Sequence, residues 1–149
     1  MNLIRVTSDL ASIDLRQAHQ WIASSYWSAN IPFETFERAC AHSLVFAAFD
    51  EDHQVGFARV VTDRATFAWL CDVFVAPDTR GRGVARRLLE AIMADERLQG
   101  LRQFVLATRD AHGLYEKFGF ERAGDQAGRL MRIARQPSEV YGAPTGRQP

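Results

Sequence analysis

The chain has 149 residues, which suits a single domain with a sizeable buried core. Hydrophobic residues make up 47% and charged residues 24%, the proportions of an ordinary soluble globular protein. The formal net charge is zero, which excludes a protein that binds polyanions through its overall charge. We therefore expect no nucleic-acid partner, and any phosphate must be recognised locally. The basic residues are 17 arginines and Lys117, a bias that weakens arguments from arginine number alone.

The two cysteines, Cys40 and Cys71, have neither metal-ligand spacing nor a disulfide pattern. We expect no metal ion and a reducing, cytoplasmic compartment. The N-terminal segment lacks the apolar core of a signal peptide. The longest apolar stretch, near residues 66–76, is interrupted by Asp72 and is too short to span a membrane. No membrane partner is expected.

Hydrophobic periodicity divides the first half of the chain into strands and helices. Asp14 stands at the N-cap position of the first helix. The last strand of this half is rich in aromatic and β-branched residues, and Pro77 stops it. The predicted elements are a strand at 3–6, helices at 15–26 and 33–42, and strands at 44–50, 55–62 and 66–76.

The second half begins with a segment of helical period that Gly100 ends. Asp110 is the expected N-cap of a second, shorter helix, which Gly119 ends. Proline, glycine and polar residues then predict a disordered tail over residues 136–149. The predicted elements are helices at 83–97 and 110–118 and strands at 103–108, 121–123 and 129–134.

This order of elements predicts a mixed α/β fold of the α+β kind. Adjacent antiparallel hairpins lead into one β-α-β crossover, so the sheet is mainly antiparallel and not doubly wound. Helices flank the sheet. The sequence shows no internal repeat, and residues 1–135 are expected to form a single domain.

The segment "DTRGRGVARRLLEAIM" follows a strand with a proline stop and runs into a helix. Within residues 80–87 it holds four arginines and two glycines. The first N–H groups of a helix have no internal partner, and with the helix dipole they attract an anion. Gly81 and Gly83 let an anion approach the backbone, because they carry no Cβ. The pattern favours a pyrophosphate site.

The arginines of this loop divide into two pairs. Arg80 and Arg82 flank the glycines and can add charge-assisted hydrogen bonds to a phosphate. Arg86 and Arg87 lie a turn later, where they reach a more distant phosphate or face solvent. Two other interpretations stay open on this stretch alone: a solvated helix start, or an RNA-binding element. The second would need aromatic neighbours and a net basic domain, and residues 80–87 contain no aromatic.

Two common phosphate-binding loops do not match this segment. The P-loop needs Gly-Lys-Ser or Gly-Lys-Thr, and neither triplet occurs in the chain. The dinucleotide-binding fingerprint needs a third glycine at the position of Arg86. The loop is therefore of another kind.

The segment "DVFVAPDTRGRGVARRLLEAIM" resembles motif A of the GNAT superfamily of acyl-CoA-dependent N-acetyltransferases, with Arg80, Gly83 and Ala85 at its signature positions. About 30 residues later, "LYEKFGF" at 114–120 is similar to motif B of the same superfamily. The two motifs stand in the family's order and spacing. The resemblance extends over roughly residues 3–134 and is specific between the two motifs.

The resemblance implies that the motif A strand and the next strand splay apart at a bulge, with the pantetheine arm of acetyl-CoA between them. Main-chain groups of Phe74 and Val75 would pair with pantetheine amides, and the Val75 amide would stabilise the developing oxyanion. The pyrophosphate would bind the N–H groups where the helix begins. The implied cofactor-binding residues are Phe74, Val75, Arg80, Gly81, Arg82, Gly83, Val84, Ala85 and Thr108.

Motif B supplies the implied general acid. Tyr115 matches the family tyrosine that donates a proton to the departing CoA thiolate. The alternative for Tyr115 is a helix tyrosine that packs on the sheet. Seven residues before it, where the family often has asparagine, this chain has Thr108. Thr108 or Arg109 replaces that cofactor contact, or the contact is lost.

The resemblance also implies that a primary amine attacks the thioester directly in a ternary complex, so no cysteine nucleophile is needed. Asp72 is the candidate base, because it interrupts an apolar strand just before the bulge. It equally fits a structural role, in which it holds a neighbouring loop, and a water chain can replace it as base. Cys71 is expected to be a small buried side chain. Weaker candidates for the base are Glu34, Glu37 and His112.

The acceptor side is expected in the first two helices and their connection. Tyr26 and Trp27 lie at the end of a helix and could form an apolar or cation-binding wall for the amine. The expected partner is a small-molecule or peptide amine that the sequence does not identify further. Dimerisation is common in the family, and the apolar C-terminal region would contribute to a homodimer.

The predicted function is therefore an acetyl-CoA-dependent N-acetyltransferase. The alternative is a non-catalytic acyl-CoA-binding or regulatory module on the same fold. Release of free CoA in the presence of an amine separates the two, since only the enzyme turns over.

Overall fold

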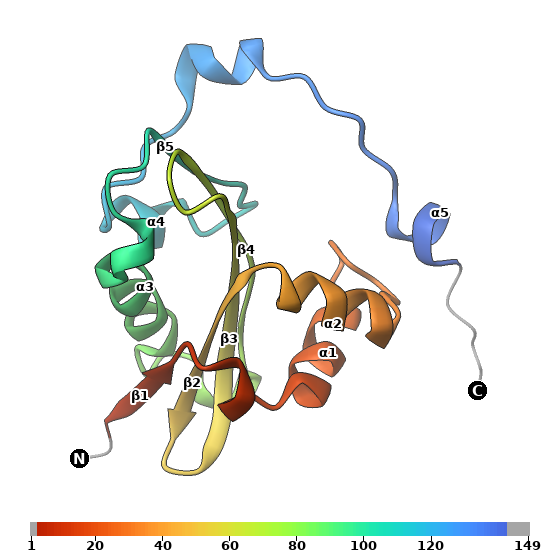
Figure 1. Ribbon diagram of the computed structural model, residues 1–149, viewed down its shortest axis with the longest axis vertical. Helices are drawn as coiled ribbons and strands as arrows, with labels where there is room; N and C mark the ends of the chain where they lie inside the picture. Colours follow the sequence, from red (N-terminus) through yellow and green to blue (C-terminus); the bar gives the residue numbers. More distant parts are fainter. Residues whose placement is uncertain (1–2, 143–149) are drawn as a thin grey trace.

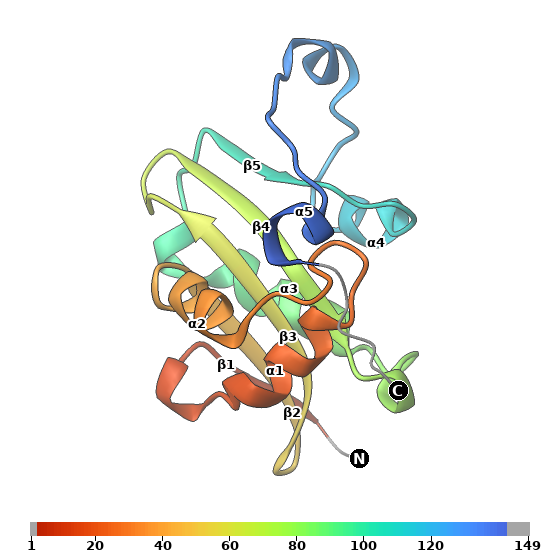
Figure 2. The same cartoon turned by 90° about the vertical axis from the view of Figure 1, so that its right-hand side faces the viewer.

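The computed structural model describes residues 3–142, which form a five-stranded sheet with helices on both faces (Figures 1 and 2). The strands are β1 (Ile4–Thr7), β2 (Leu44–Asp50), β3 (His53–Thr62), β4 (Phe67–Val75) and β5 (Gln103–Leu106). They lie in the order β1-β2-β3-β4-β5. Neighbouring strands are antiparallel except β4 and β5, which are parallel and joined through a helix. The predicted mixed sheet with one β-α-β crossover is confirmed.

Two helices cover each face of the sheet, as Figure 1 shows. On one side lie α1 (Leu15–Ala23) and α2 (Phe33–Ala41), and on the other lie α3 (Val84–Ala94) and α4 (His112–Glu116). A further short helix, α5 (Pro137–Tyr141), lies on the side of α1 and α2. Within residues 3–142, no helix combines the length and the apolar character that crossing a membrane requires.

The strand β2 shows why both faces need a cover. Successive strand side chains point to opposite faces, so the uninterrupted apolar run "LVFAAF" supplies both sides of the sheet. One set packs in the cluster that includes α3: Leu44, Phe46 and Ala48. The other set packs in the cluster that includes α1 and α2: Val45, Ala47 and Phe49. The two hydrophobic clusters thus lie on either side of the sheet.

The N-terminal helices follow the sequence signals closely. The Asp14 carboxylate accepts a hydrogen bond from the backbone N–H of Gln17 at 3.0 Å, which confirms the predicted N-cap. The helix α1 ends at Ala23, three residues before the predicted end. There the Ser25 hydroxyl donates to the carbonyl of Ile22 at 2.6 Å, a local bond that competes with the helical ladder.

The ends of α3 and the start of α4 differ from the prediction. The helix α3 ends three residues early, because Asp95 takes an extended conformation and its carboxylate accepts from the N–H of Arg97 at 2.9 Å. Asp110 is not the N-cap of α4, which begins after Ala111. The Thr108 hydroxyl instead accepts from the N–H of Ala111 at 3.0 Å, so a threonine three residues upstream closes this turn.

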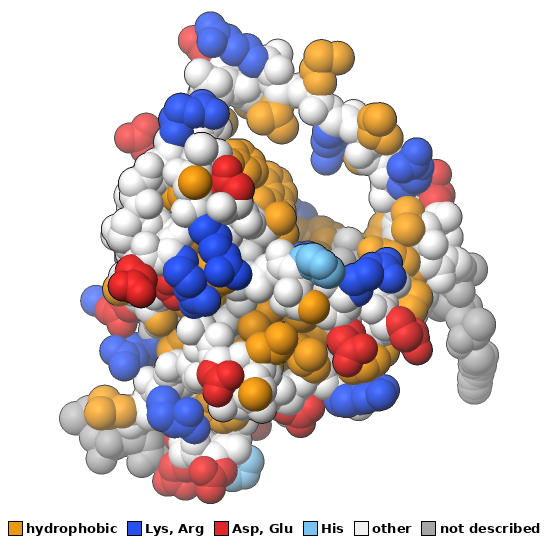
Figure 3. All heavy atoms as spheres, in the orientation of Figure 1, with side chains coloured by type: hydrophobic (Ala, Val, Ile, Leu, Met, Phe, Trp, Pro, Cys, Tyr) orange, Lys and Arg blue, Asp and Glu red, His pale blue; other side chains and the backbone are white. Residues whose placement is uncertain are grey.

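The C-terminal arm, residues 121–136, stands away from the rest of the molecule, and Figure 3 shows open space between the two. Its side chains are exposed, and the two strands predicted here are wrong: the arm holds a 3₁₀ helix at Gly124–Arg129 and is otherwise irregular. A strand needs a neighbour for its N–H and C=O groups, which local pattern cannot supply. The helix α5 lies within the predicted tail, and residues 143–149 lie outside the described residues.

Candidate functional site

A β-bulge in β4 organises the site. The pairing with β3 shifts between Phe57 and Arg59, where one β3 residue faces two residues of β4, Asp72 and Val73. Asp72 takes a left-handed backbone conformation with φ of 54°. Such a bulge bends the strand and turns its side chains and main-chain groups to new directions.

The strands β4 and β5 diverge beyond the first half of β4. Their pairing ends where Leu70 meets Leu106, whereas β4 continues to Val75. The second half of β4 therefore presents an edge that β5 does not cover. This divergence is the opening that the family resemblance implies.

The Val75 main chain faces that opening. On the next residue, the N–H of Ala76 donates to the carbonyl of Val55 at 2.8 Å, toward β3. Main-chain groups of successive strand residues point to opposite sides, so those of Val75 point away from β3. The Val75 carbonyl accordingly accepts from Arg80 Nε at 3.2 Å. By the same alternation, the main chain of Phe74 turns toward β3 and not toward the opening, and its ring stacks on Trp21 of α1 with centroids 5.3 Å apart.

Two glycines shape the loop that precedes α3. Gly81 and Gly83 have φ of 79° and 80°, a conformation that other residues rarely adopt. A Cβ at either position would meet no atom within 4 Å, so the backbone there is open to solvent. Gly83 is the N-cap of α3 and provides no side-chain cap. The first N–H groups of α3, at Val84 and Ala85, therefore have no side-chain acceptor and are open to an acceptor from outside the chain.

Most arginines of this loop form ion pairs with acidic side chains of the protein. Arg82 forms an ion pair with Asp50 at 2.9 Å. Arg86 and Arg87 lie on the surface of α3, where both approach Glu90, at 3.5 and 3.3 Å. These two fit the solvated helix face and not a phosphate contact. Arg80 is different, because its Nε donates to the Val75 carbonyl at the end of β4.

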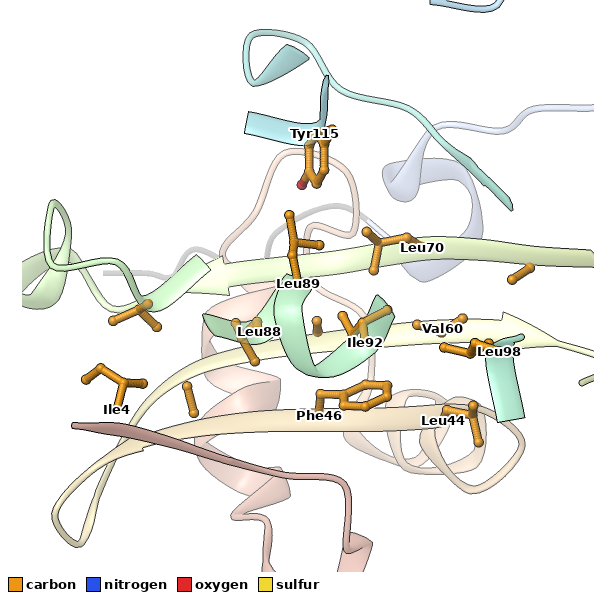
Figure 4. Close-up of a cluster of buried hydrophobic side chains, with 14 of the residues drawn as sticks. Ile4, Leu44, Phe46, Val60, Leu70, Leu88, Leu89, Ile92, Leu98 and Tyr115 are labelled. Carbon is orange, nitrogen blue, oxygen red and sulfur yellow. The ribbon is translucent and has the colours of Figure 1, made fainter. Parts of the chain in front are cut away.

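Tyr115 projects from α4 onto the core, and its hydroxyl points toward α3 and β4 in Figure 4. The side chain is buried, and its ring lies 6.1 Å from that of Phe120. Burial raises the pKa of Tyr115, because the phenolate loses hydration there. The phenol therefore keeps its proton at neutral pH, as a proton donor must.

A cavity of about 780 Å³ lies beside Tyr115, between β5, α4 and the start of the C-terminal arm. Thr108 and His112 contribute to its wall. Thr108 closes the turn before α4, where its oxygen accepts one hydrogen bond, so its hydroxyl proton and second lone pair stay available for a ligand. His112 is thus the one weaker base candidate that lines this cavity, whereas Glu34 and Glu37 are exposed on α2.

Asp72 holds the connection between α1 and α2 to the bulge. The residue is buried, and each carboxylate oxygen accepts a hydrogen bond. Trp27 Nε1 donates to one oxygen at 2.9 Å, and Arg59 Nε donates to the other at 2.8 Å. Arg59 also donates to the Ser43 hydroxyl at 3.1 Å. With both oxygens occupied, Asp72 matches the structural role better than that of a free base.

Sequence reasoning did not select Arg59, although a signal was present. In "VGFARVVT", Arg59 is the single charge in an apolar strand, as Asp72 is in "TFAWLCDVFVA". Two lone opposite charges in strands that pair directly predict a buried ion pair. Only the register of β3 and β4 establishes that the two meet.

Tyr26 contacts a residue from the loop between β5 and α4. The Arg109 guanidinium lies 4.0 Å from the centre of the Tyr26 ring, a cation–π contact, and Trp27 packs edge-on at 5.1 Å. The Tyr26 ring, which the sequence predicts as a contact for the amine, therefore already contacts the Arg109 cation. Tyr26 and Trp27 remain 57% and 39% exposed.

The cysteines take no part in this arrangement. Burial raises the pKa of both Cys40 and Cys71 to about 12, so they stay protonated and are poor nucleophiles. In the part of the chain that the structure describes, no group of three or more potential ligand side chains is placed to hold a metal ion.

Comparison with known proteins places this geometry in a family. Residues 41–122 match the model of the acetyltransferase (GNAT) domain. An inferred GNAT-family acetyltransferase of Xanthomonas campestris pv. campestris is 42% identical, with 96% of this chain and 99% of that chain covered and a TM-score of 0.87. An inferred acetyltransferase of Gibberella zeae is 27% identical over 135 residues, with 75% of each chain covered.

A more distant structure shares the fold alone. It is that of an inferred acetyltransferase of Clostridium acetobutylicum with acetyl-CoA, at 14% identity and a TM-score of 0.63. The alignment covers 90% of this chain and 96% of that chain. The overall fold thus recurs at low sequence identity.

Proposed function

Because this chain belongs to the GNAT family of acetyltransferases, we propose that it transfers the acetyl group of acetyl-CoA to a primary amine by direct attack in a ternary complex. One observation carries the proposal: the exposed main-chain edge at Val75 lies beside the uncapped N-terminus of α3. A ligand that carries both a thioester and a pyrophosphate needs both features, the main-chain edge for the thioester and the helix N-terminus for the pyrophosphate. The proposed acceptor is a small-molecule or peptide amine, and the proposed location is the cytoplasm.

The residues present fit acetyl-CoA as cosubstrate. The N–H groups of Val84 and Ala85 have no side-chain cap, and the space at Gly81 and Gly83 is open, so a pyrophosphate can contact the backbone. Arg80 adds a positive charge beside them. When bound, acetyl-CoA supplies an activated thioester, and this chain supplies binding, orientation and proton transfer.

Two groups of the chain act on the reacting atoms in this proposal. The Val75 N–H, which faces the opening, donates a hydrogen bond to the carbonyl oxygen as negative charge develops on it. The Tyr115 phenol, whose raised pKa keeps it protonated, donates its proton to the departing sulfur. Loss of an oxyanion donor commonly costs about 100-fold to 1000-fold in rate, and loss of a general acid about 100-fold to 10,000-fold, so the rate should depend on both groups.

Asp72 acts as a positioning residue and not as the base. Its carboxylate holds Trp27 and Arg59, which fixes the α1–α2 connection against the bulge at the border of the acceptor cleft. The amine then loses its proton through water. Trp27 and Tyr26, the latter backed by Arg109, line that border.

The decisive experiment compares the same substitution at the two ends of α3. Ala85→Asp places a carboxylate among the phosphate-binding N–H groups, and Ala94→Asp places one at the exposed far end. We expect CoA to raise the Tm of the wild type and of Ala94→Asp. Ala85→Asp should bind CoA at least tenfold more weakly than the wild type does. Unchanged affinity in Ala85→Asp would contradict the assignment of the loop.

Turnover is measured separately, as thiol release from acetyl-CoA with a panel of primary amines. We expect release that depends on the amine. If CoA binds but no amine supports release, the chain is a binding module and the proposed catalysis is wrong. If CoA does not bind, the assignment of acetyl-CoA as the cosubstrate is wrong.

A further inference from the structure

Arg109 connects the end of β5 with the segment between α1 and α2. The strand β5 pairs with β4 as far as Leu106, and Arg109 follows in the loop that leads to α4. Its guanidinium carbon lies 4.0 Å from the centre of the Tyr26 ring, which belongs to the α1–α2 connection. Figure 2 shows this connection beside the loop before α4. The contact therefore lies where β5 has parted from β4.

A continuous series of contacts fixes the Tyr26 ring relative to the bulge. Trp27 packs edge-on against Tyr26, with ring centroids 5.1 Å apart. Trp27 Nε1 donates to the Asp72 carboxylate, which the Arg59 guanidinium holds from its other side. The series begins at a buried ion pair and ends at Arg109. The Arg109 side chain is therefore held beside the opening, although it is exposed.

The Arg109 guanidinium has free hydrogen-bond donors. Among residues 3–142, it takes part in none of the observed ion pairs, and its cation–π contact is with Tyr26. Such a contact uses the face of the guanidinium, whereas the N–H groups lie in the plane of the group. Stacking on the ring therefore restricts the orientation without occupying a donor. A planar fork of free N–H groups matches a carboxylate, which accepts two of them in parallel.

The charges around the bulge leave Arg109 uncompensated. The ion pair of Asp72 and Arg59, with 2.8 Å between the two side chains, is neutral as a whole. Tyr26 and Trp27 add aromatic surface to this cluster. The connected side chains thus carry one excess positive charge, which lies on Arg109. An anionic group on a ligand in the opening would compensate this charge.

Building on the proposed function, we propose that the acceptor amine carries a carboxylate, which Arg109 binds while the amine reaches the thioester. The acceptor class is an amino acid or a short peptide. Tyr26 is a positioning residue that supports the guanidinium. The anion belongs to the acceptor and not to CoA, because Arg109 contacts the α1–α2 connection, whereas the proposed phosphate-binding loop precedes α3 on the other face of the sheet.

The test measures whether a preference for a carboxylate depends on Arg109. Thiol release from acetyl-CoA is followed with glycine, β-alanine and 4-aminobutyrate, and with the primary amide of each. The quantity compared is the ratio of kcat/KM for an acid to kcat/KM for its amide. The different basicities of the two amines cancel when this ratio is compared between the wild type and a variant.

Arg109→Gln should lower this ratio about 10-fold to 100-fold for the best acid, because hydrogen bonds to a charged group contribute that much. Arg109→Glu should lower it further, since like charges repel. The control Arg16→Gln removes another exposed guanidinium that lies over a ring, 3.8 Å from the centre of Phe33, at the other end of α1 from Tyr26. Its ratio should equal that of the wild type. An unchanged ratio in Arg109→Gln overturns the proposal.

The support from Tyr26 is tested with the same ratio. Tyr26→Phe keeps the ring and should keep the ratio. Tyr26→Ala removes the ring and should lower the ratio about twofold to fivefold, the contribution of an exposed cation–π contact. A purely structural role of Tyr26 would change turnover of the acid and of the amide alike. A ratio in Tyr26→Ala equal to that of the wild type contradicts the positioning role.

CoA affinity separates the two anions that Arg109 could bind. Thermal shift with CoA should give the same affinity for Arg109→Gln as for the wild type. A loss of CoA affinity together with an unchanged ratio would show that Arg109 contacts a phosphate of the coenzyme, and the proposal is then wrong. Turnover of amines with no dependence on a carboxylate also overturns it, but leaves the proposed function intact. If CoA binds and no amine supports release, both are wrong.

Discussion

The ion pair between Asp72 and Arg59 yields the sharpest prediction. Asp72→Ala removes the acceptor of both Arg59 Nε and Trp27 Nε1, and no other carboxylate in the described residues pairs with Arg59. The guanidinium is then left with the Ser43 hydroxyl as its remaining side-chain partner. A charge that is buried without its counter-charge is strongly unfavourable.

The expected loss in the free energy of unfolding follows from the burial of this ion pair. The side chains of Arg59 and Asp72 are only 18% and 4% exposed, so solvent screens the pair weakly. Removal of one member of a buried pair costs about 3–5 kcal/mol. For a chain of this length, that loss lowers Tm by about 10 °C. Glu90→Ala, which breaks half-exposed pairs with Arg86 and Arg87, should cost less than about 1 kcal/mol.

Urea unfolding followed by fluorescence measures these differences, with the m-value as a check that the unfolding transition is unchanged. Asp72→Leu/Arg59→Met should recover much of the loss, because a packed apolar pair has no desolvation cost. A loss for Asp72→Ala as small as that for Glu90→Ala would refute the reasoning.

A kinetic readout distinguishes positioning from base catalysis. Trp27→Phe removes the indole N–H that Asp72 accepts, and it should raise KM for the amine while the pH dependence of kcat stays as in the wild type. Asp72→Asn should behave in the same way. If Asp72→Asn instead abolishes the acid limb of the kcat profile, Asp72 is the base.

Two further predictions concern groups that burial keeps protonated. Tyr115→Phe should lower kcat by about 100-fold with unchanged CoA affinity, and equal activity would remove the general-acid role. Since the raised pKa of Tyr115 keeps the phenol neutral below its ordinary value near 10, the wild-type rate should not fall between pH 7 and about 9 through loss of this proton. Cys40 and Cys71, with pKa values raised to about 12, should react with a thiol reagent at pH 8 about a thousandfold more slowly in the folded protein than in urea. Fast reaction in the native state would show that these thiols are not buried as described.

Local pattern was sufficient for most elements and for the glycine loop before α3. The run "LVFAAFD" predicts β2 to the residue, because an apolar segment bounded by turn residues has few alternatives. Asp14 predicts the start of α1 through its own hydrogen bond. The glycines at 81 and 83 predict the loop before α3, since their backbone conformation is local. The two motifs, read with this order of elements, were enough to indicate the family.

Prediction from the local sequence pattern failed where the role of a residue depends on a partner that is distant in the sequence. The sequence marked Asp72 as unusual, but its partners lie 13 and 45 residues away, and only the register at the bulge brings Arg59 and Trp27 to it. Likewise, the sequence predicts Tyr26 as part of a wall for the amine, and only the fold places Arg109 over its ring.

The C-terminal arm separates the two kinds of information most clearly. Its sequence has the alternation of a strand, so the preference for extended structure is encoded locally. Whether a strand forms depends on a second backbone edge at hydrogen-bonding distance, and that is a property of the tertiary or quaternary arrangement. The sequence by itself determined most of the elements, the glycine loop before α3 and the family. The tertiary structure decided which charges are paired, which main-chain groups face the cleft, and that the arm stands free of its own sheet.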